Sequence, residues 1–236
     1  MSDGIYVSMN GAAARMAQLE SISDNLANAQ TPGFKATRPS FEAFLAKSDD
    51  GSGSKVYPAA VATQLDLSTG AIVQTGNNLD VVPSGKSFLA VQTGTGIALT
   101  RAGRLQVERD GTLMAAGRPV VDRDNKPIVT PPNSQVRIDP NGSVFANDTR
   151  VGEIALYDVN GPVDRISPSL LAPQDPKSIT LSNDSLRVGE IETGNASPLE
   201  AAIQLVSAQR HFESSMQALQ TYRRMDERAS EVGRTR

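Results

Sequence analysis

Two glycine-containing stretches resemble the loops with which proteins bind phosphates. Ser84-Gly85-Lys86-Ser87 ends like a nucleotide phosphate-binding loop, but that loop needs a glycine five positions before the lysine and a helix after it. Val81 stands at the glycine position and a strand-like run follows, so the sequence predicts a turn. Gly94-Thr95-Gly96 lacks the third glycine of a dinucleotide-binding loop, because Leu99 occupies its place, and predicts a hairpin turn.

Acid–base chemistry has few candidates. His211, the single histidine, has no serine or cysteine nucleophile context, which favours a surface or helix-contact role. The carboxylates of Asp80, Glu108 and Asp139 could pair as glycosidase acids, but nothing in their spacing selects two of them. We therefore predict no catalytic residue and no enzyme.

The composition excludes several kinds of site. The chain has no cysteine, which rules out disulfides, thiolate catalysis and cysteine-based metal sites, and one histidine leaves no pair for a metal. We predict no metal and no cofactor. The net charge of -3 gives no basic field for nucleic acid, and no apolar run is long enough for direct membrane insertion. The first four residues lack the basic and apolar regions of a cleavable secretion signal.

The N-terminus has the pattern of a long amphipathic helix from Ile5 to Leu26. Apolar residues recur alternately four and three positions apart, with a break at Ser23, as in a helix that packs lengthwise against another helix. Asn28 and Pro32-Gly33 predict where it ends. The N-terminal assembly seam comprises Ile5, Met9, Ala12, Met16, Leu19 and Leu26.

A second long helix is predicted from Leu199 onward, because no glycine or proline interrupts the chain before Gly233. Ser197-Pro198 with Glu200 is a favourable helix start. The C-terminal assembly seam comprises Leu199, Ile203, Val206, Phe212, Met216, Leu219, Tyr222 and Met225. Since isolated amphipathic helices are only marginally stable in water, we expect both helices to be frayed in a free monomer.

The middle of the chain, from about Ser87 to Leu186, is predicted to be all-β. Strand-like runs alternate with turn dipeptides such as Asp110-Gly111 and Asn141-Gly142. Residues 105–113 match residues 136–144 position for position in polarity, which predicts two related hairpins. We expect a small sandwich or barrel of antiparallel strands.

The predicted fold class is α+β, with N- and C-terminal amphipathic helices packing as a coiled-coil-like stalk and an inserted antiparallel all-β domain. Thr75-Gly76-Asn77 before the β domain and Thr193-Gly194-Asn195 after it resemble each other, as expected for an insertion. The segment 49–54 is predicted to be a flexible connection. The predicted parts are an N-terminal helix and hinge (1–35), an extended linker or stalk segment (36–85), the antiparallel β domain (86–188), and a return strand with the C-terminal helix (189–236).

The stretch from Ser23 to Lys35 resembles the N-terminal signature shared by bacterial flagellar rod and hook proteins, the axial proteins. Residues 75–80 and 88–107 resemble the second and third blocks of that family, and residues 207–213 resemble part of its closing helix. We interpret Thr31–Phe34 as a hinge, although a plain helix stop explains Pro32 and Gly33 equally well. The residues that match the family motif are Asn25, Asn28, Thr31, Pro32, Gly33 and Phe34.

The resemblance implies a structural function without chemistry. Family members are exported unfolded by the type III export apparatus, and their terminal helices form an inner tube while the β domain lies outside it. The implied partners are further copies in a helical array, other proximal and distal rod proteins, and the export apparatus. The implied location is the basal-body rod, which spans the periplasm.

The chain length favours a proximal-rod subunit, because distal rod and hook proteins are generally longer. A distal rod subunit is one alternative. Another is a soluble β-rich binding module whose two helices clasp each other within the monomer. A cell-wall hydrolase is a third, but the sequence offers no acid pair for it.

Overall fold

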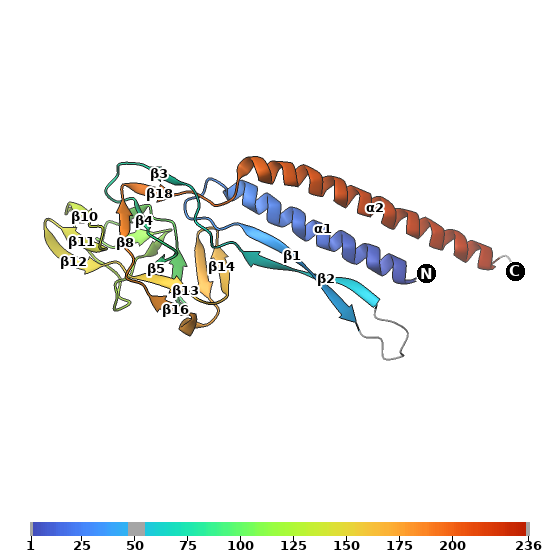
Figure 1. Cartoon of the computed structure of the whole chain (residues 1–236), viewed down its shortest axis with the longest axis horizontal. Helices are drawn as coiled ribbons and strands as arrows, with labels where there is room; N and C mark the ends of the chain where they lie inside the picture. The colour runs from blue at the N-terminus through green and yellow to red at the C-terminus, as the bar shows by residue number, and fades with distance from the viewer. Residues whose placement is uncertain (1, 47–54, 235–236) are drawn as a thin grey trace. The chain divides into compact units, whose positions relative to one another are not determined.

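The computed structural model describes residues 2–46 and 55–234, so most of the connection predicted at 49–54 lies outside the described residues. The chain forms two compact units (Figure 1). The first unit contains both chain ends and one stretch of sequence between them, and the second contains the rest. The first comprises Met1–Ala27, Thr37–Gln64 and Ser197–Arg236, and the second comprises Asn28–Ala36 and Leu65–Ala196.

The first unit contains the two predicted helices, α1 (Ser2–Asn28) and α2 (Pro198–Arg234), which lie side by side and antiparallel in Figure 1. The start of α2 follows the capping rules, since the hydroxyl of Ser197 accepts a hydrogen bond from the Glu200 amide at 3.4 Å. Proline at the first helical position adds to this start. The existence and approximate limits of both helices are therefore confirmed.

The predicted coiled-coil-like stalk is wrong. Within the described residues, the buried apolar cluster between the helices contains Ile22, Ala201 and Ala208, with Leu19, Leu26 and Leu205 packed against it. This cluster spans about two turns of each helix, far less than a heptad seam along their full length. The side chains of Met9 and Met16 are exposed instead of packed in such a seam. The α+β layout itself agrees with the prediction.

A two-stranded sheet explains part of this difference. Strands β1 (Thr37–Ala46) and β2 (Lys55–Leu65) pair with each other, and β1 begins against α1. The hydroxyl of Ser21 donates a hydrogen bond to the Thr37 carbonyl at 3.3 Å. Because α1 shares its surface between α2 and this sheet, its apolar stripe cannot serve a two-helix seam alone.

The second unit is built of short antiparallel strands. A six-stranded sheet has the order β14-β15-β6-β5-β13-β16, and two three-stranded sheets have the orders β7-β8-β9 and β10-β11-β12. Two pairs, β17-β4 and β18-β3, complete the described sheets of the unit. The strands are β3 (Ile72–Gln74), β4 (Val81–Pro83), β5 (Phe88–Thr93), β6 (Gly96–Thr100), β7 (Leu105–Val107), β8 (Leu113–Ala115), β9 (Arg118–Pro119), β10 (Val136–Ile138), β11 (Ser143–Ala146), β12 (Thr149–Glu153), β13 (Leu156–Val159), β14 (Val163–Ser167), β15 (Leu170–Pro173), β16 (Ile179–Leu181), β17 (Leu186–Val188) and β18 (Glu190–Glu192).

The two related hairpins predicted from the internal repeat are confirmed. In β7–β8 the Gly111 amide donates to the Glu108 carbonyl at 2.9 Å, and in β10–β11 the Gly142 amide donates to the Asp139 carbonyl at the same distance. Both glycines have positive φ angles, +88° and +85°, which the turn requires. The sequence similarity therefore reflects one turn geometry used twice.

The main core of the second unit lies among these strands. It gathers fully buried aliphatic side chains from both hairpins and from β5, among them Leu89, Leu113 and Val144. Among the described residues, neither helix has an apolar stretch long enough to cross a membrane, and no group of three or more acidic or histidine side chains is placed to bind a metal ion.

Candidate functional site

The segment that follows α1 is anchored within the second unit. Its backbone turns at once, because the Thr31 amide donates to the Asn28 carbonyl at 2.9 Å and the Phe34 amide donates to the Thr31 carbonyl at 3.2 Å. The ring of Phe34 is fully buried, and the guanidinium of Arg165 lies 4.6 Å from its centroid. We call residues 31–35 the motif loop.

Gly33 allows the motif loop to pack directly on backbone. Its φ angle is +70°, and a Cβ atom added there would lie 2.1 Å from the Ala102 nitrogen. Its amide donates a hydrogen bond to the Glu192 carbonyl at 2.9 Å, in strand β18. Glycine is therefore required by conformation and by space, and the loop is fixed between two segments distant in sequence.

Beside Gly33 lies a buried ion cluster, formed by Lys35, Glu192 and Arg101. The Lys35 ammonium lies 2.7 Å from Glu192 Oε1, and Arg101 Nη1 lies 3.2 Å from Glu192 Oε2. None of the three side chains is more than 1% exposed. The Glu192 carboxylate thus forms ion pairs with two cations, Lys35 and Arg101, that are both buried away from water.

Backbone carbonyls provide the remaining partners of the two cations. Lys35 Nζ donates to the Ser68 carbonyl at 2.6 Å, and Arg101 donates to the Pro83 and Gly85 carbonyls at 2.7 and 2.6 Å. The Gly70 amide donates to Glu192 Oε1 at 2.9 Å. These bonds compensate for much of the lost hydration, which a buried charge requires, while the buried Arg101 Nε has no hydrogen-bond partner among the described residues.

Burial changes the protonation equilibria of the cluster. It lowers the pKa of Lys35 below its ordinary value of 10.5, and the hydrogen bond and charge of Glu192 offset part of that effect. The pKa of Arg101 is lowered by burial as well, with Glu192 opposing the change. Glu192 is therefore the group that favours the protonated, charged forms of both Lys35 and Arg101 in this buried environment.

Asn195 completes the junction where the chain leaves the second unit. Its backbone amide donates to the Phe34 carbonyl at 3.2 Å, and its side-chain oxygen accepts from the Ala36 backbone amide at 2.6 Å. Its side-chain nitrogen donates to the Asp66 carbonyl at 2.7 Å. The segments at residues 33–36, 66–70 and 192–195 are thus joined by one hydrogen-bond network.

Asn25 has a separate role in the first unit. Its side-chain oxygen accepts from the Thr37 amide and its nitrogen donates to the Thr37 carbonyl, both at 2.8 Å. The side chain therefore pairs with Thr37 as a neighbouring strand would. This explains why asparagine, rather than another helix residue, stands at that position of the motif.

Asn25→Leu is expected to destabilise the first unit by about 2 kcal/mol, because the Thr37 amide loses its partner and the Thr37 carbonyl keeps only the longer bond from the Ser21 hydroxyl. Chemical denaturation monitored by circular dichroism measures the loss. Ser23→Leu, at an exposed position on the same helix, is the control. Equal stabilities for the two variants would contradict this role of Asn25.

The predicted seam residues differ in their surroundings. Ala12 and Leu219 are buried, and Leu19, Leu26, Phe212 and Met216 are half-buried. The side chain of Ile5 lies outside the described part of the chain. The exposed members are Met9, Met16, Leu199, Ile203, Val206, Tyr222 and Met225.

The residues considered for chemistry have ordinary environments. Ser84–Ser87 forms a turn followed by strand β5, with the Ser87 hydroxyl donating to the Ser84 carbonyl at 3.1 Å. Asp80 is buried at 4.0 Å from Arg104, and Arg137 donates to Asp139. His211 is exposed on α2.

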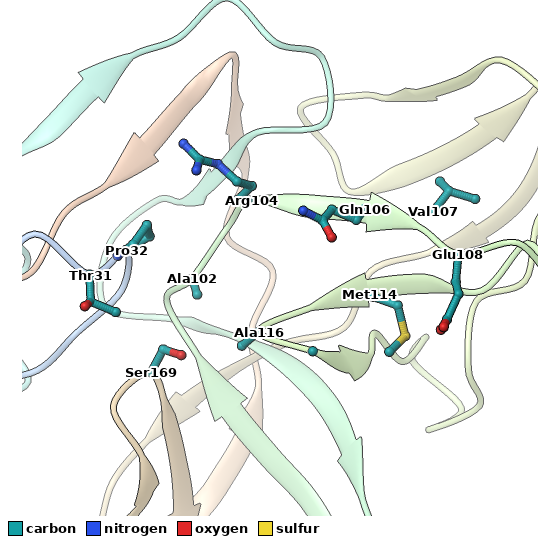
Figure 2. A pocket seen from close by; sticks show the side chains of 11 residues that line it. Thr31, Pro32, Ala102, Arg104, Gln106, Val107, Glu108, Met114, Ala116 and Ser169 are labelled. Carbon is teal, nitrogen blue, oxygen red and sulfur yellow. The ribbon is translucent and has the colours of Figure 1, made fainter. Parts of the chain in front are cut away.

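A groove of about 610 Å³ lies on the outer face of the β7–β8 hairpin (Figure 2). Thr31 and Pro32 of the motif loop form one wall, and Glu108 and Met114 lie at the far end in Figure 2. Its other lining residues are Ala102, Arg104, Gln106, Val107, Ala116, Gly117 and Ser169. We call it the β7–β8 groove.

Sequence reasoning did not identify the ion cluster or the groove. Two of these ionised residues nevertheless lie in stretches that resemble the axial family, and the third lies beside a repeated tripeptide. Lys35 ends the N-terminal signature, Arg101 lies in the third block, and Glu192 directly precedes Thr193-Gly194-Asn195. A charged residue beside each motif was the available signal.

Comparisons with known proteins agree with this geometry. A family model described as "Flagella basal body rod protein" matches residues 5–35, and one described as "Flagellar basal body rod FlgEFG protein C-terminal" matches residues 187–232. The first match ends at Lys35 and the second includes Glu192, so the two matched segments meet in the buried ion pair.

Similar proteins match over nearly the whole chain. The flagellar basal-body rod protein FlgF of Mesorhizobium japonicum is 31% identical over 99% of both chains, and FlgF of Salmonella typhimurium is 28% identical over 98% of both. The flagellar basal-body rod protein FlgG of Buchnera aphidicola from Schizaphis graminum is 25% identical over 98% of this chain and 100% of its own. The chain belongs to the FlgF-like family of flagellar basal-body rod proteins.

Proposed function

We propose that the chain is a structural subunit of the proximal rod, which polymerises through its terminal helices to form part of a hollow drive shaft. The observation that carries this proposal is the near full-length identity with FlgF proteins, which exceeds that with the FlgG protein quoted above. A distal rod subunit is the less favoured alternative for the same reason. In this proposal the chain transmits torque and performs no chemistry.

The exposed apolar side chains of both helices support assembly. Met16 is 54% exposed on α1 and Leu199 is 73% exposed on α2, although both belong to regular apolar rows. Burying such side chains against neighbouring subunits contributes about 25 cal/mol per Å² of apolar surface. We infer that the predicted assembly seams act between subunits, with further copies in a helical array and with other rod proteins.

The same proposal assigns a separate role to each part of the chain. The terminal helices form the inner tube, the β-rich unit lies outside it, and the motif loop marks the turn between them. The type III export apparatus delivers the chain, and the rod spans the periplasm. No nucleic acid and no cofactor has a role in this scheme.

The proposal is tested by expressing the chain in a bacterium whose own proximal-rod gene has been deleted. Isolated basal bodies are then analysed by mass spectrometry, and motility is measured in soft agar. Incorporation with restored motility is the expected result. A chain that folds but is absent from basal bodies would show that the proposed function is wrong.

Met16→Asp is expected to reduce incorporation at least about tenfold, because a charge would enter an apolar contact between subunits. Since Met16 is exposed in the monomer, the stability of the free chain stays unchanged, which denaturation measures. Leu219→Asp is less informative, because Leu219 is already buried within the chain. Met16→Leu is the control, and normal motility of Met16→Asp would rule out this seam.

A further inference from the structure

We propose that the β7–β8 groove of one copy receives the first four turns of α2 from a second copy. This contact rests on the proposed function, since it operates between subunits of one assembly. It adds a defined surface and a defined partner segment to that function, and it makes the motif loop part of an interface.

The groove is a sheet face that the second unit leaves open. Because side chains alternate along a strand, Leu105, Leu113 and Ala115 point into the core. Gln106 and Met114, which alternate with these residues on β7 and β8, line the groove together with Arg104, Val107 and Glu108 (Figure 2). The groove lining thus combines apolar side chains with the opposite charges of Arg104 and Glu108, which lie directly before and after β7.

The first turns of α2 present a second apolar row. Ala201, Leu205 and Ala208 face α1, and this side is covered. Leu199, Ile203 and Val206 follow the spacing i, i+4 and i+7 on another side, and each is at least 50% exposed. This row has no covering element among the described residues of its unit.

The charges on the groove and on α2 are opposite in sign and similarly spaced, so the two surfaces are complementary. Arg104 and Glu108 lie four residues apart, directly before and after β7, which corresponds to about 14 Å of extended chain. Glu200 and Arg210 lie ten residues apart on α2, which corresponds to about 15 Å. With Glu200 toward Arg104 and Arg210 toward Glu108, the apolar row lies over the apolar side chains that line the groove.

The other exposed apolar groups fit the groove less well. Met9 and Met16 on α1 are followed by the acidic Glu20, and the corresponding positions before them carry no basic residue. Tyr222 and Met225 lie beside the basic Arg223 and Arg224 and the acidic Asp226 and Glu227, but these opposite charges are at most four residues, or about 6 Å, apart, against about 14 Å in the groove. The first turns of α2 carry an acid at one end and a base at the other, as the groove requires.

Disulfide cross-linking tests the contact, because the native chain has no cysteine. Two differently tagged chains, one carrying Ile203→Cys and the other Met114→Cys, are co-expressed in the rod-deficient strain. Basal bodies are isolated and oxidised. A disulfide-linked dimer containing both tags is expected, and Val107→Cys serves as a second groove variant if Met114→Cys impairs folding. Ile203→Cys with Val129→Cys, an exposed position outside the groove, is the control and should give no dimer.

Charge reversal provides an independent measurement on the full chain. Glu108→Arg and Arg210→Glu are each expected to lower the dimer yield about threefold or more, because like charges then face each other. Combining the two substitutions should restore the yield of the unreversed chains. Failure of the double variant to exceed both single variants would overturn the proposed pairing.

The outcomes separate this inference from the proposed function. If the variants enter basal bodies but Ile203→Cys links to neither groove position, the contact is wrong and the rod function stands. Linkage of Met114→Cys to another rod protein would show that a different subunit occupies the groove. Absence of the unmodified chain from basal bodies would refute the proposed function and, with it, this contact.

Discussion

Glu192→Gln is expected to destabilise the second unit by about 3 to 5 kcal/mol, because it leaves Lys35 and Arg101 buried without a counter-charge. Glutamine keeps the size of the side chain, so the loss reports charge rather than a cavity. Urea denaturation followed by circular dichroism measures it. Glu190→Gln is the matched control in the same strand, since the half-buried Glu190 pairs with the exposed Arg187 and its substitution should cost at most about 1 kcal/mol.

The pH dependence of the same variant distinguishes charge from packing. Burial already lowers the pKa of Lys35, and removal of Glu192 lowers it further. Between a lowered folded pKa and the unfolded value near 10.5, the unfolded chain binds more protons, so stability rises with pH. The gap in unfolding free energy between Glu192→Gln and the native chain should therefore narrow from neutral pH toward pH ~10. A constant gap would show that lost charge is not the cause.

Gly33→Val is expected to destabilise the second unit by about 3 kcal/mol or more and to release the motif loop. The substitution imposes an unfavourable positive φ and places a side chain into the backbone of Arg101 and Ala102. Limited proteolysis should then cut near residues 31–36 at least about tenfold faster than in the native chain, as expected for a loss of that size. Denaturation measures the accompanying loss of stability.

A matched glycine separates strain from steric conflict. Gly76 has a φ angle of +73°, but a Cβ atom there would meet nothing within 4 Å. Gly76→Val should therefore lower the free energy of unfolding only by the backbone strain of a positive φ angle, about 1 to 2 kcal/mol. If Gly33→Val were no worse than this control, close backbone packing would not be the reason for Gly33. Normal rod assembly by Gly33→Val would also contradict the predicted hinge role of residues 31–34.

Local features of the fold were predictable from sequence, because local signals determine them. Helix limits followed from Pro198 and from the break after Asn28, and both hairpin turns followed from Asp-Gly and Asn-Gly dipeptides. The packing partner of each helix was not predictable in the same way. Periodicity identifies an apolar face but does not say whether a helix, a sheet or another subunit covers it.

The ion cluster depends on contacts distant in sequence, which explains why it escaped prediction. Lys35, Arg101 and Glu192 come from three segments, and no spacing rule connects them. The β1–β2 pair was missed for a related reason, since residues 36–85 were predicted only as an extended linker or stalk segment and the pairing of two strands within it follows from tertiary structure. The groove likewise exists only once the motif loop has docked against Ala102.

The order of the ion pair along the chain has a consequence for how the protein is made. Lys35 leaves the ribosome 157 residues ahead of Glu192, so its ammonium stays hydrated until most of the sequence has been synthesised. Closing so long a loop is a slow, entropically costly step compared with forming the hairpins between them. The two ends of the β-rich unit are thus joined late, and a truncated chain that stops before residue 192 has no means of closing this junction.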